Sequence, residues 1–148
     1  MLRDVTEEDL AIFFEHQRDP EAHRMAAFPP REHDAFMLHW RTKVMGDPTA
    51  RKRTIVVDDC VAGNIGSWDA DGRRLVGYWI GREYWGRGIG TAALSEFLCE
   101  EKTRPLCAHV AAQNTASIRI LRKCGFRQLD DIELGFDGVE EYLFQLDP

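Results

Sequence analysis

The sequence predicts an α+β domain with a mixed, mostly antiparallel sheet flanked by about four helices. Three short strand-like runs follow one another between Thr54 and Ile80, joined only by turns. A glycine-rich stretch and a helical pattern then lead to a further strand-like run, and such a connection places that strand parallel to the preceding one. Two more strand-like runs close the chain, so the order differs from the alternation of a doubly wound fold.

Length and composition limit the class of protein. The 148 residues suit a single domain, 1–148, that buries ~68–70% of its unfolded surface. No apolar run reaches the length of a membrane span, and the net charge of −6 argues against nucleic-acid binding. No C-x-x-C pair occurs, so we expect buried, reduced thiols in a cytoplasmic protein, with no metal site. These thiols are Cys60, Cys99, Cys107 and Cys124.

The first third of the chain predicts a short strand and two helices. Residues 1–5 form the strand, and Thr6 is the expected cap of a helix that stops near Asp19-Pro20. The segment 28–30, Phe-Pro-Pro, is a break, and residues 31–45 follow with helical spacing. The aromatic residues here favour a core role over ligand contacts.

From residue 51 the pattern changes to strands. We expect strands over 54–57, 61–68 and 74–80, then a helix over 88–101 and a strand over 105–111. A second helix begins at Asn114, a typical capping residue, and Gly125 ends it. Two strands, 128–136 and 140–146, close the chain around Asp137-Gly138.

The stretch Tyr84-Trp85-Gly86-Arg87-Gly88-Ile89-Gly90-Thr91 lies between a predicted strand and a predicted helix. Glycines at alternate positions allow the backbone to wrap an anion with its N–H groups, and the following helix adds the positive end of its dipole. The spacing G-x-G-x-G matches neither the dinucleotide fingerprint nor the nucleoside-triphosphate loop. A phosphate-binding loop and a plain glycine-rich turn are the two interpretations of this stretch alone.

A second segment favours the phosphate-binding interpretation. The loop resembles the pyrophosphate loop [QR]-x-x-G-x-[GA] of the GNAT acetyltransferases, with Trp85 in place of the leading Gln or Arg. The helix that begins at Asn114 resembles the same superfamily's N-x-x-[AS]-x-x-[LV]-x-x-[KR]-x-G-F segment. With Ser117 in this helix and Leu121 where many members carry Tyr, it is most similar to the ribosomal-protein N-terminal (Rim-like) branch.

The resemblance implies acetyl-CoA as co-substrate and N-acetylation of an amine, with the first third of the chain forming the acceptor wall. Main-chain groups near Ile80 and Gly81 would pair with the pantetheine arm and polarise the thioester carbonyl. The full set of implied cofactor contacts is Ile80, Gly81, Gly86, Arg87, Gly88, Ile89, Gly90, Thr91, Asn114 and Ser117.

The catalytic groups are less well defined by the sequence. Leu121 cannot donate a proton, so Ser117, water or another group serves as general acid, or the thiolate leaves unaided. His109 is the candidate base, because it lies five residues before Asn114, where similar enzymes carry a catalytic Glu. A buried, hydrogen-bonded structural histidine is the alternative, and Glu83 and Asp69 are weaker candidates for the base.

The acceptor is specified only by charge. Residues 128–148 carry seven carboxylates and no Lys or Arg. This charge favours a cationic amine as acceptor, such as a peptide N-terminus or a small molecule. The alternative interpretation is a solvated acidic hairpin with no role in binding. The alternative to an acetyltransferase is a non-catalytic acyl-CoA-binding module, and a weaker one is an unrelated phosphate-ester binder. We expect a monomer or homodimer, with no membrane partner.

Overall fold

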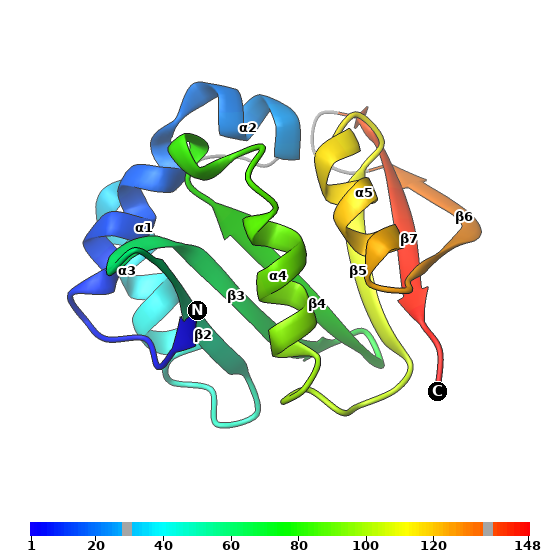
Figure 1. The fold of residues 1–148 in the computed structure, drawn as a ribbon, viewed down its shortest axis with the longest axis horizontal. Coiled ribbons are helices and arrows are strands. Elements are labelled where there is room, and N and C mark those ends of the chain that lie inside the picture. Colours follow the sequence, from blue (N-terminus) through cyan, green and yellow to red (C-terminus); the bar gives the residue numbers. More distant parts are fainter. Residues whose placement is uncertain (28–30, 135–137) are drawn as a thin grey trace.

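A twisted seven-stranded sheet forms the centre of the molecule in the computed structural model, which describes residues 1–27, 31–134 and 138–148 (Figure 1). The strands lie in the order β1-β2-β3-β4-β5-β7-β6, and every neighbouring pair is antiparallel except β4 and β5. The strands are β1 (Leu2–Arg3), β2 (Arg51–Val57), β3 (Cys60–Ala70), β4 (Arg73–Ile80), β5 (Leu106–Ala111), β6 (Arg127–Leu134) and β7 (Glu140–Leu146). The predicted mixed, mostly antiparallel sheet is confirmed.

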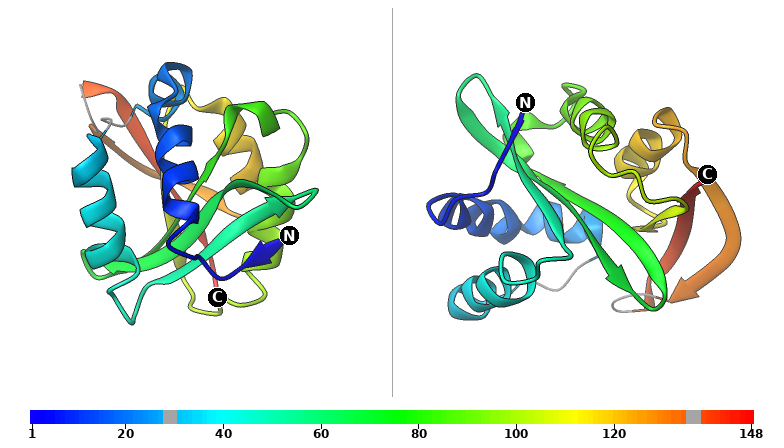
Figure 2. Two further views of the ribbon diagram at one scale, coloured as in Figure 1. Left: turned by 90° about the vertical axis from the view of Figure 1, so that its left-hand side faces the viewer. Right: turned by 90° about the horizontal axis from the view of Figure 1, so that it is seen from below.

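Helices cover both faces of this sheet (Figure 2). They are α1 (Asp9–Arg18), α2 (Pro20–Ala26), α3 (His33–His39), α4 (Ile89–Phe97) and α5 (Thr115–Lys123), with a π-helical turn η1 (Trp40–Val44) and a 3-10 turn η2 (Arg82–Tyr84). Helices α4 and α5 pack on one face over the main core, whereas α1, α2 and α3 lie on the other.

The main core consists of apolar side chains from one face of the sheet and from the apolar faces of α4 and α5. Ile65 and Val76 of the sheet meet Leu94 and Phe97 of α4 and Leu121 of α5. A second cluster, Leu10, Phe13, Phe36 and Met37, joins α1 to α3. The aromatic residues of the first third that the structure describes, Phe13, Phe14, Phe36 and Trp40, therefore pack in this cluster, as predicted.

The first third also departs from the sequence prediction. Thr6 does not cap α1; instead its N–H donates to the carboxylate of Asp9, at 2.9 Å. The buried Asp9 also accepts from Thr54 and Arg3. The structure adds a helix, α2, directly after α1, because Asp19 caps it and Pro20 occupies its first turn.

Two other boundaries moved. The helix predicted over 88–101 ends at Phe97, and the chain then turns so that the Glu101 carboxylate is buried against β3 and β4. The segment predicted as one helix over 31–45 divides into α3 and the π-helical turn. The break at 28–30, the end of the strand predicted over 128–136 and Asp137 of the closing turn lie outside the described residues.

The cysteines are only partly as expected. All four are free thiols, but Cys60 and Cys99 are exposed, whereas Cys107 is buried and Cys124 is partly buried. Cys60 follows the turn at Asp58-Asp59 and Cys99 follows the last turn of α4, so neither faces the core despite its apolar neighbours.

Candidate active site

The site is a cleft of about 320 Å³ that opens where β4 and β5 part. These parallel strands pair only at Arg74 with Leu106 and at Leu75 with Cys107. Beyond Leu75, β4 pairs only with β3, so the other edge of β4 faces the cleft. The backbone polar groups along this edge are therefore available to a ligand.

Stereochemistry shows which main-chain groups of β4 point into the cleft. The Gly81 N–H donates to the Ala62 carbonyl of β3 at 2.8 Å. Because the C=O and N–H of a trans peptide point in opposite directions, the Ile80 carbonyl points away from β3 and into the cleft. The N–H and C=O of one residue in a strand share a side, so the Ile80 N–H points there as well.

Gly81 differs from Ile80 in this respect. Its N–H is bonded to Ala62, and its carbonyl accepts the N–H of Tyr84 at 2.9 Å. Of the two residues that the resemblance implied for the pantetheine arm, Ile80 therefore offers main-chain groups to the cleft, whereas the main chain of Gly81 is engaged within the protein. Gly81 is instead packed tightly, since an added Cβ would lie 2.7 Å from Nε2 of His16.

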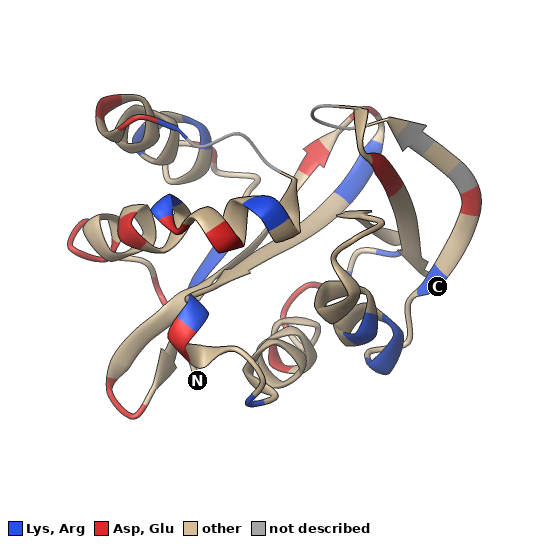
Figure 3. Ribbon diagram, turned by 90° about the horizontal axis from the view of Figure 1, so that it is seen from above, with Lys and Arg blue, Asp and Glu red and all other residues tan. Residues whose placement is uncertain are grey.

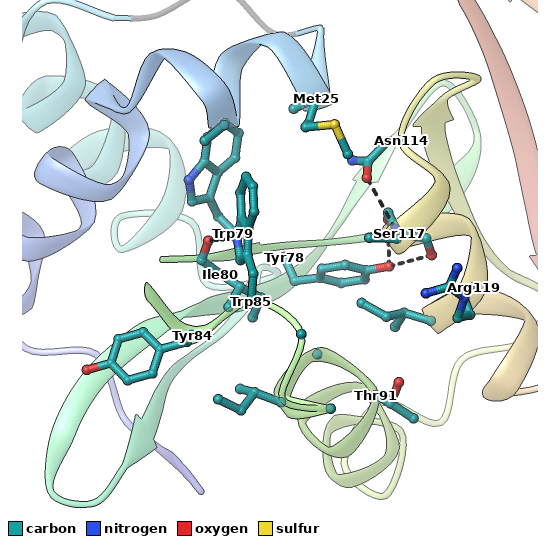
Figure 4. Close-up of a pocket in the computed structure, with 18 of the residues that line it drawn as sticks. Met25, Tyr78, Trp79, Ile80, Tyr84, Trp85, Thr91, Asn114, Ser117 and Arg119 are labelled. Atoms are coloured by element: carbon teal, nitrogen blue, oxygen red, sulfur yellow. Dashed lines mark hydrogen bonds between the residues drawn. The ribbon is translucent and has the colours of Figure 1, made fainter. Parts of the chain in front are cut away.

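Trp85 forms a hydrogen bond with one of the two main-chain groups of Ile80 that face the cleft. Its indole Nε1–H donates to the Ile80 carbonyl at 2.9 Å, and its side chain lines the cleft (Figure 4). This tryptophan stands where the family pattern has Gln or Arg, and its bond joins the start of the glycine-rich loop to the end of β4. The Ile80 N–H is left as the donor that faces the cleft.

The three glycines of the loop have two different roles. Gly86 and Gly88 have φ values of +73° and +75°, a region that side-chain-bearing residues rarely adopt. Gly90 lies within α4, and an added Cβ there would lie 2.5 Å from the Ile120 side chain of α5. The first two glycines therefore shape the loop, and the third allows α4 and α5 to pack closely.

Positive charge near the glycine loop comes mainly from α5. Arg119 and Lys123 line the cleft opposite the N-terminal end of α4, a helix that carries no Lys or Arg (Figure 3). Helix N-termini and basic side chains both attract phosphate groups. Arg87 does not line the cleft; it stacks on Tyr84 and lies 3.9 Å from the Asp58 carboxylate. The helical pattern of α5 alone did not show that its basic residues face the glycine loop.

The start of α5 carries the polar groups on the second wall of the cleft. Asn114 caps the helix, and its side-chain oxygen accepts the Ser117 N–H at 3.2 Å. The Tyr78 hydroxyl lies 2.8 Å from the Ser117 hydroxyl and 3.3 Å from the Ser117 carbonyl (Figure 4). Burial, only partly offset by the bond to Ser117, raises the pKa of Tyr78 to about 12. This phenol was not among the residues that the sequence singled out.

Leu121, at the usual position of the family's Tyr, is buried in the main core with 1% of its surface exposed. Where many family members have the tyrosine hydroxyl, this chain therefore has an apolar side chain that packs in the core. Tyr78 comes from the facing strand and packs against the same core.

His109 is placed on the other side of the sheet. It pairs with Leu143 across β5 and β7, and Leu143 clusters with Cys107 and Leu75, away from α4 and α5. Its Nδ1 lies 3.3 Å from a carboxylate oxygen of Glu141, and 29% of its side chain is exposed. His109 is thus a partly exposed residue with a carboxylate partner, and it is not a lining residue of the cleft.

The cleft extends to α2. Ala22, Met25 and Ala26 line it together with Trp79, whose indole donates to the His16 carbonyl at 3.3 Å. The sequence suggested the first third of the chain as an acceptor wall but missed α2. The signal for it was present, since Asp19-Pro20 is a capping residue followed by a residue typical of a helix start.

The residues present fit a CoA thioester. A loop with two left-handed glycines, a helix N-terminus and two basic side chains suit a pyrophosphate, and the unpaired edge of β4 suits the amide-bearing arm. Across the described parts of the chain, no group of three or more His, Cys, Asp or Glu side chains is arranged to hold a metal. No helix in those parts is long and apolar enough to cross a membrane.

Comparison with known proteins shows the family to which the chain belongs. Residues 1–127 match the family model described as acetyltransferase (GNAT) domain. No curated protein sequence matches the chain. A spermidine N-acetyltransferase from Vibrio cholerae, in complex with CoA and spermine, superimposes with a TM-score of 0.85 at 14% identity, over 99% of this chain and 94% of that one.

Two other solved structures are similar. A ribosomal-protein-alanine N-acetyltransferase from Brucella melitensis has a TM-score of 0.78 at 18% identity, over 100% of this chain and 99% of that one. An aminoglycoside acetyltransferase in complex with coenzyme A has a TM-score of 0.78 at 18% identity, over 98% and 93% of the two chains. These likenesses show the shared fold. With the family match over most of its length, the chain belongs to the GNAT family of acetyl-CoA-dependent N-acetyltransferases.

Proposed function

We propose that this enzyme transfers the acetyl group of acetyl-CoA to a primary amine, either a protein N-terminus or a small cationic amine. The observation that carries the proposal is the parting of β4 and β5 beside a left-handed glycine loop. Acetyl-CoA supplies the acetyl group as an activated thioester. A direct attack of the amine needs a polarised carbonyl, a neutral amine and a stabilised leaving group.

Three groups of the chain meet these needs in the proposal. The Ile80 N–H is the donor that polarises the thioester carbonyl, a kind of contact worth ~2.7–4 kcal/mol in well-studied enzymes. His109 does not line the cleft, so it takes the proton of the amine through water, and Glu141 orients its ring through Nδ1. Ser117 faces the departing sulfur from the start of α5.

The amine class is supported by charge and by the neighbours. Glu141 places a carboxylate beside His109, and the three similar enzymes are named for acting on spermidine, ribosomal-protein alanine and aminoglycosides, all of them amines. The acceptor would enter along α2, Trp79 and the His109 side of the sheet. We propose that the enzyme works in the cytoplasm, where its four free thiols stay reduced, as a monomer or homodimer.

Calorimetric titration with acetyl-CoA tests the cofactor site, with Gly88→Ala as the test variant and Gly72→Ala as its matched control. Both glycines have φ of +75° and open space around them, but Gly72 lies in the distant β3–β4 turn. Each substitution should destabilise the fold by ~1–2 kcal/mol through left-handed strain. Only Gly88→Ala should weaken acetyl-CoA binding, by about tenfold or more, a cost of about 1.4 kcal/mol.

Absence of binding to the folded wild-type protein would overturn the proposal. Equal loss of affinity in both variants would show that strain, not the loop, weakens binding. Turnover with a panel of peptide N-termini, polyamines and amino sugars then identifies the acceptor. Tight binding without turnover of any amine would instead support the acyl-CoA-binding module.

A further inference from the structure

We infer that Tyr78 is a positioning residue that turns the Ser117 hydroxyl toward the leaving sulfur of the co-substrate. This inference rests on the proposed function and names the group that replaces the tyrosine missing from α5. It begins from the pair of hydroxyls that faces the cleft, where the Tyr78 oxygen lies 2.8 Å from the Ser117 oxygen (Figure 4).

Either hydroxyl can donate across the 2.8 Å contact. We assign Tyr78 as the donor, because a phenol is a stronger acid than an aliphatic alcohol. The Ser117 carbonyl, 3.3 Å from the phenol oxygen, is the other acceptor within reach of the phenol proton. The Ser117 hydroxyl then keeps its own proton for another partner.

That proton has no competing acceptor in the described parts of the chain. Apart from Tyr78, no side chain or main-chain group described in the structure bonds the Ser117 hydroxyl, and the Asn114 oxygen is occupied by the Ser117 N–H. The helix cap and the phenol therefore fix the serine from two sides, and its O–H remains for a group in the cleft.

The backbone of β4 gives this arrangement a rigid base. Tyr78 lies two residues before Ile80 on the same strand, and its side chain faces α5 and packs against the main core. Ser117 lies on the first turn of α5, which Asn114 caps. One strand therefore carries both the Ile80 N–H that faces the cleft and the phenol that holds Ser117.

The chemistry balances without a full proton transfer from either hydroxyl. As the amine nitrogen bonds to the carbonyl carbon and the carbon–sulfur bond breaks, its electron pair stays on sulfur as a thiolate. The Ser117 O–H donates a hydrogen bond to that thiolate, which later takes a proton from water, while the amine proton leaves through His109. The partly buried phenol, whose pKa is raised to about 12, stays protonated throughout and keeps donating to Ser117.

The test measures the pKa of the CoA thiol in the bound state, by the ultraviolet absorbance of its thiolate. A hydrogen bond to the thiolate lowers this pKa, so Tyr78→Phe and Ser117→Ala should each raise it by about one unit, the equivalent of about tenfold. The double variant should raise it no further than Ser117→Ala, since the two groups act in series. Arg119 and Lys123 line the same cleft and remain in all variants.

Tyr142→Phe is the control, because it removes a phenol that packs on the same core but does not line the cleft. Steady-state kinetics should show the same effect on kcat alone: kcat falls about tenfold in Tyr78→Phe, whereas KM for acetyl-CoA changes little. A bound-thiol pKa equal in wild type and Tyr78→Phe would overturn the inference and leave the proposed function standing. Failure of CoA to bind the wild type would overturn both.

Discussion

Single residues in this protein hold backbone and side-chain groups ready for a ligand. The Ile80 N–H faces the cleft because the N–H of the next residue is bonded to β3. The Ser117 hydroxyl contacts the Tyr78 phenol, while the Ser117 N–H donates to the Asn114 cap. Leu121 shows the complementary case, because a family position that often carries a hydroxyl is used here for core packing. In the proposal the hydroxyl comes instead from Ser117, which Tyr78 on the facing strand positions.

His109→Gln tests the proposed base at this scale. The substitution should lower kcat by about 10²-fold, because general base catalysis contributes ~10²–10⁴-fold, and should flatten the acid limb of the pH–rate profile. Acetyl-CoA affinity should be unchanged, since His109 does not line the cleft. Steady-state kinetics from acid to alkaline pH provide the measurement, with Glu141→Gln expected to give a smaller loss. A variant that keeps its rate and profile would exclude His109.

The elements are arranged so that two helix N-termini meet at one cleft. Helix α4 begins at the glycine loop and α5 begins at Asn114, and Gly90 allows them to approach closely. The parting of β4 and β5 exposes a strand edge between them. Each element therefore contributes an end or an edge, where backbone groups lack partners within the element.

Replacing Asn114 separates helix capping from ligand binding. Asn114→Ala should lower the free energy of unfolding by about 1 kcal/mol, whereas Asn114→Asp should keep most of it because aspartate also caps. Both variants lose the side-chain amide, so both should bind acetyl-CoA more weakly. Urea unfolding and calorimetry on the same preparations give the two readouts. Recovery of both stability and affinity in the aspartate variant would mean that Asn114 only caps the helix.

At the scale of the whole molecule, a buried group of polar side chains, Ser67, Arg74 and Glu101, joins β3 and β4 to the chain that follows α4. The Glu101 carboxylate, 2% exposed, accepts from Ser67 at 2.6 Å and from Arg74 at 2.8 Å, and Arg74 lies where β4 still pairs with β5. Burial opposes ionisation, but these bonds and the Thr103 N–H outweigh it and lower the pKa of Glu101 to about 2. A carboxylate whose pKa is lowered in the folded protein stabilises the fold at pH values above its ordinary pKa of 4.5. This stability is lost as the pH falls toward 2.

Glu101→Gln should therefore lower the free energy of unfolding at neutral pH by about 3 kcal/mol, because it leaves the largely buried Arg74 without its main partner. The difference from wild type should shrink as the pH falls from about 4.5 toward 2, where the wild-type carboxyl takes up its proton. Urea unfolding across this range measures it, and Glu15→Gln, a change in an exposed pair with Arg18, is the control. A difference independent of pH would contradict the assignment.

Much of the architecture was predictable from local patterns. The strands from Arg51 to Ile80, the parallel β5, the Asn114 cap and the glycine loop all follow from short-range rules of alternation, capping and backbone freedom. Helix α2 was missed, although its cap and proline were present, because seven residues give too little periodicity to recognise. The exposed Cys60 and Cys99 show that apolar neighbours in sequence do not decide burial.

The sequence by itself determined the order of the strands, the helices α4 and α5 and the family, because motifs such as the glycine loop and the Asn114 helix need only local spacing. Only the tertiary structure decided which groups meet. It joined Tyr78 to Ser117, 39 positions apart, placed Trp85 on the Ile80 carbonyl and turned His109 toward Glu141. The physical reason is that hydrogen bonds depend on distance in space, which strand register and helix packing set over long separations along the chain.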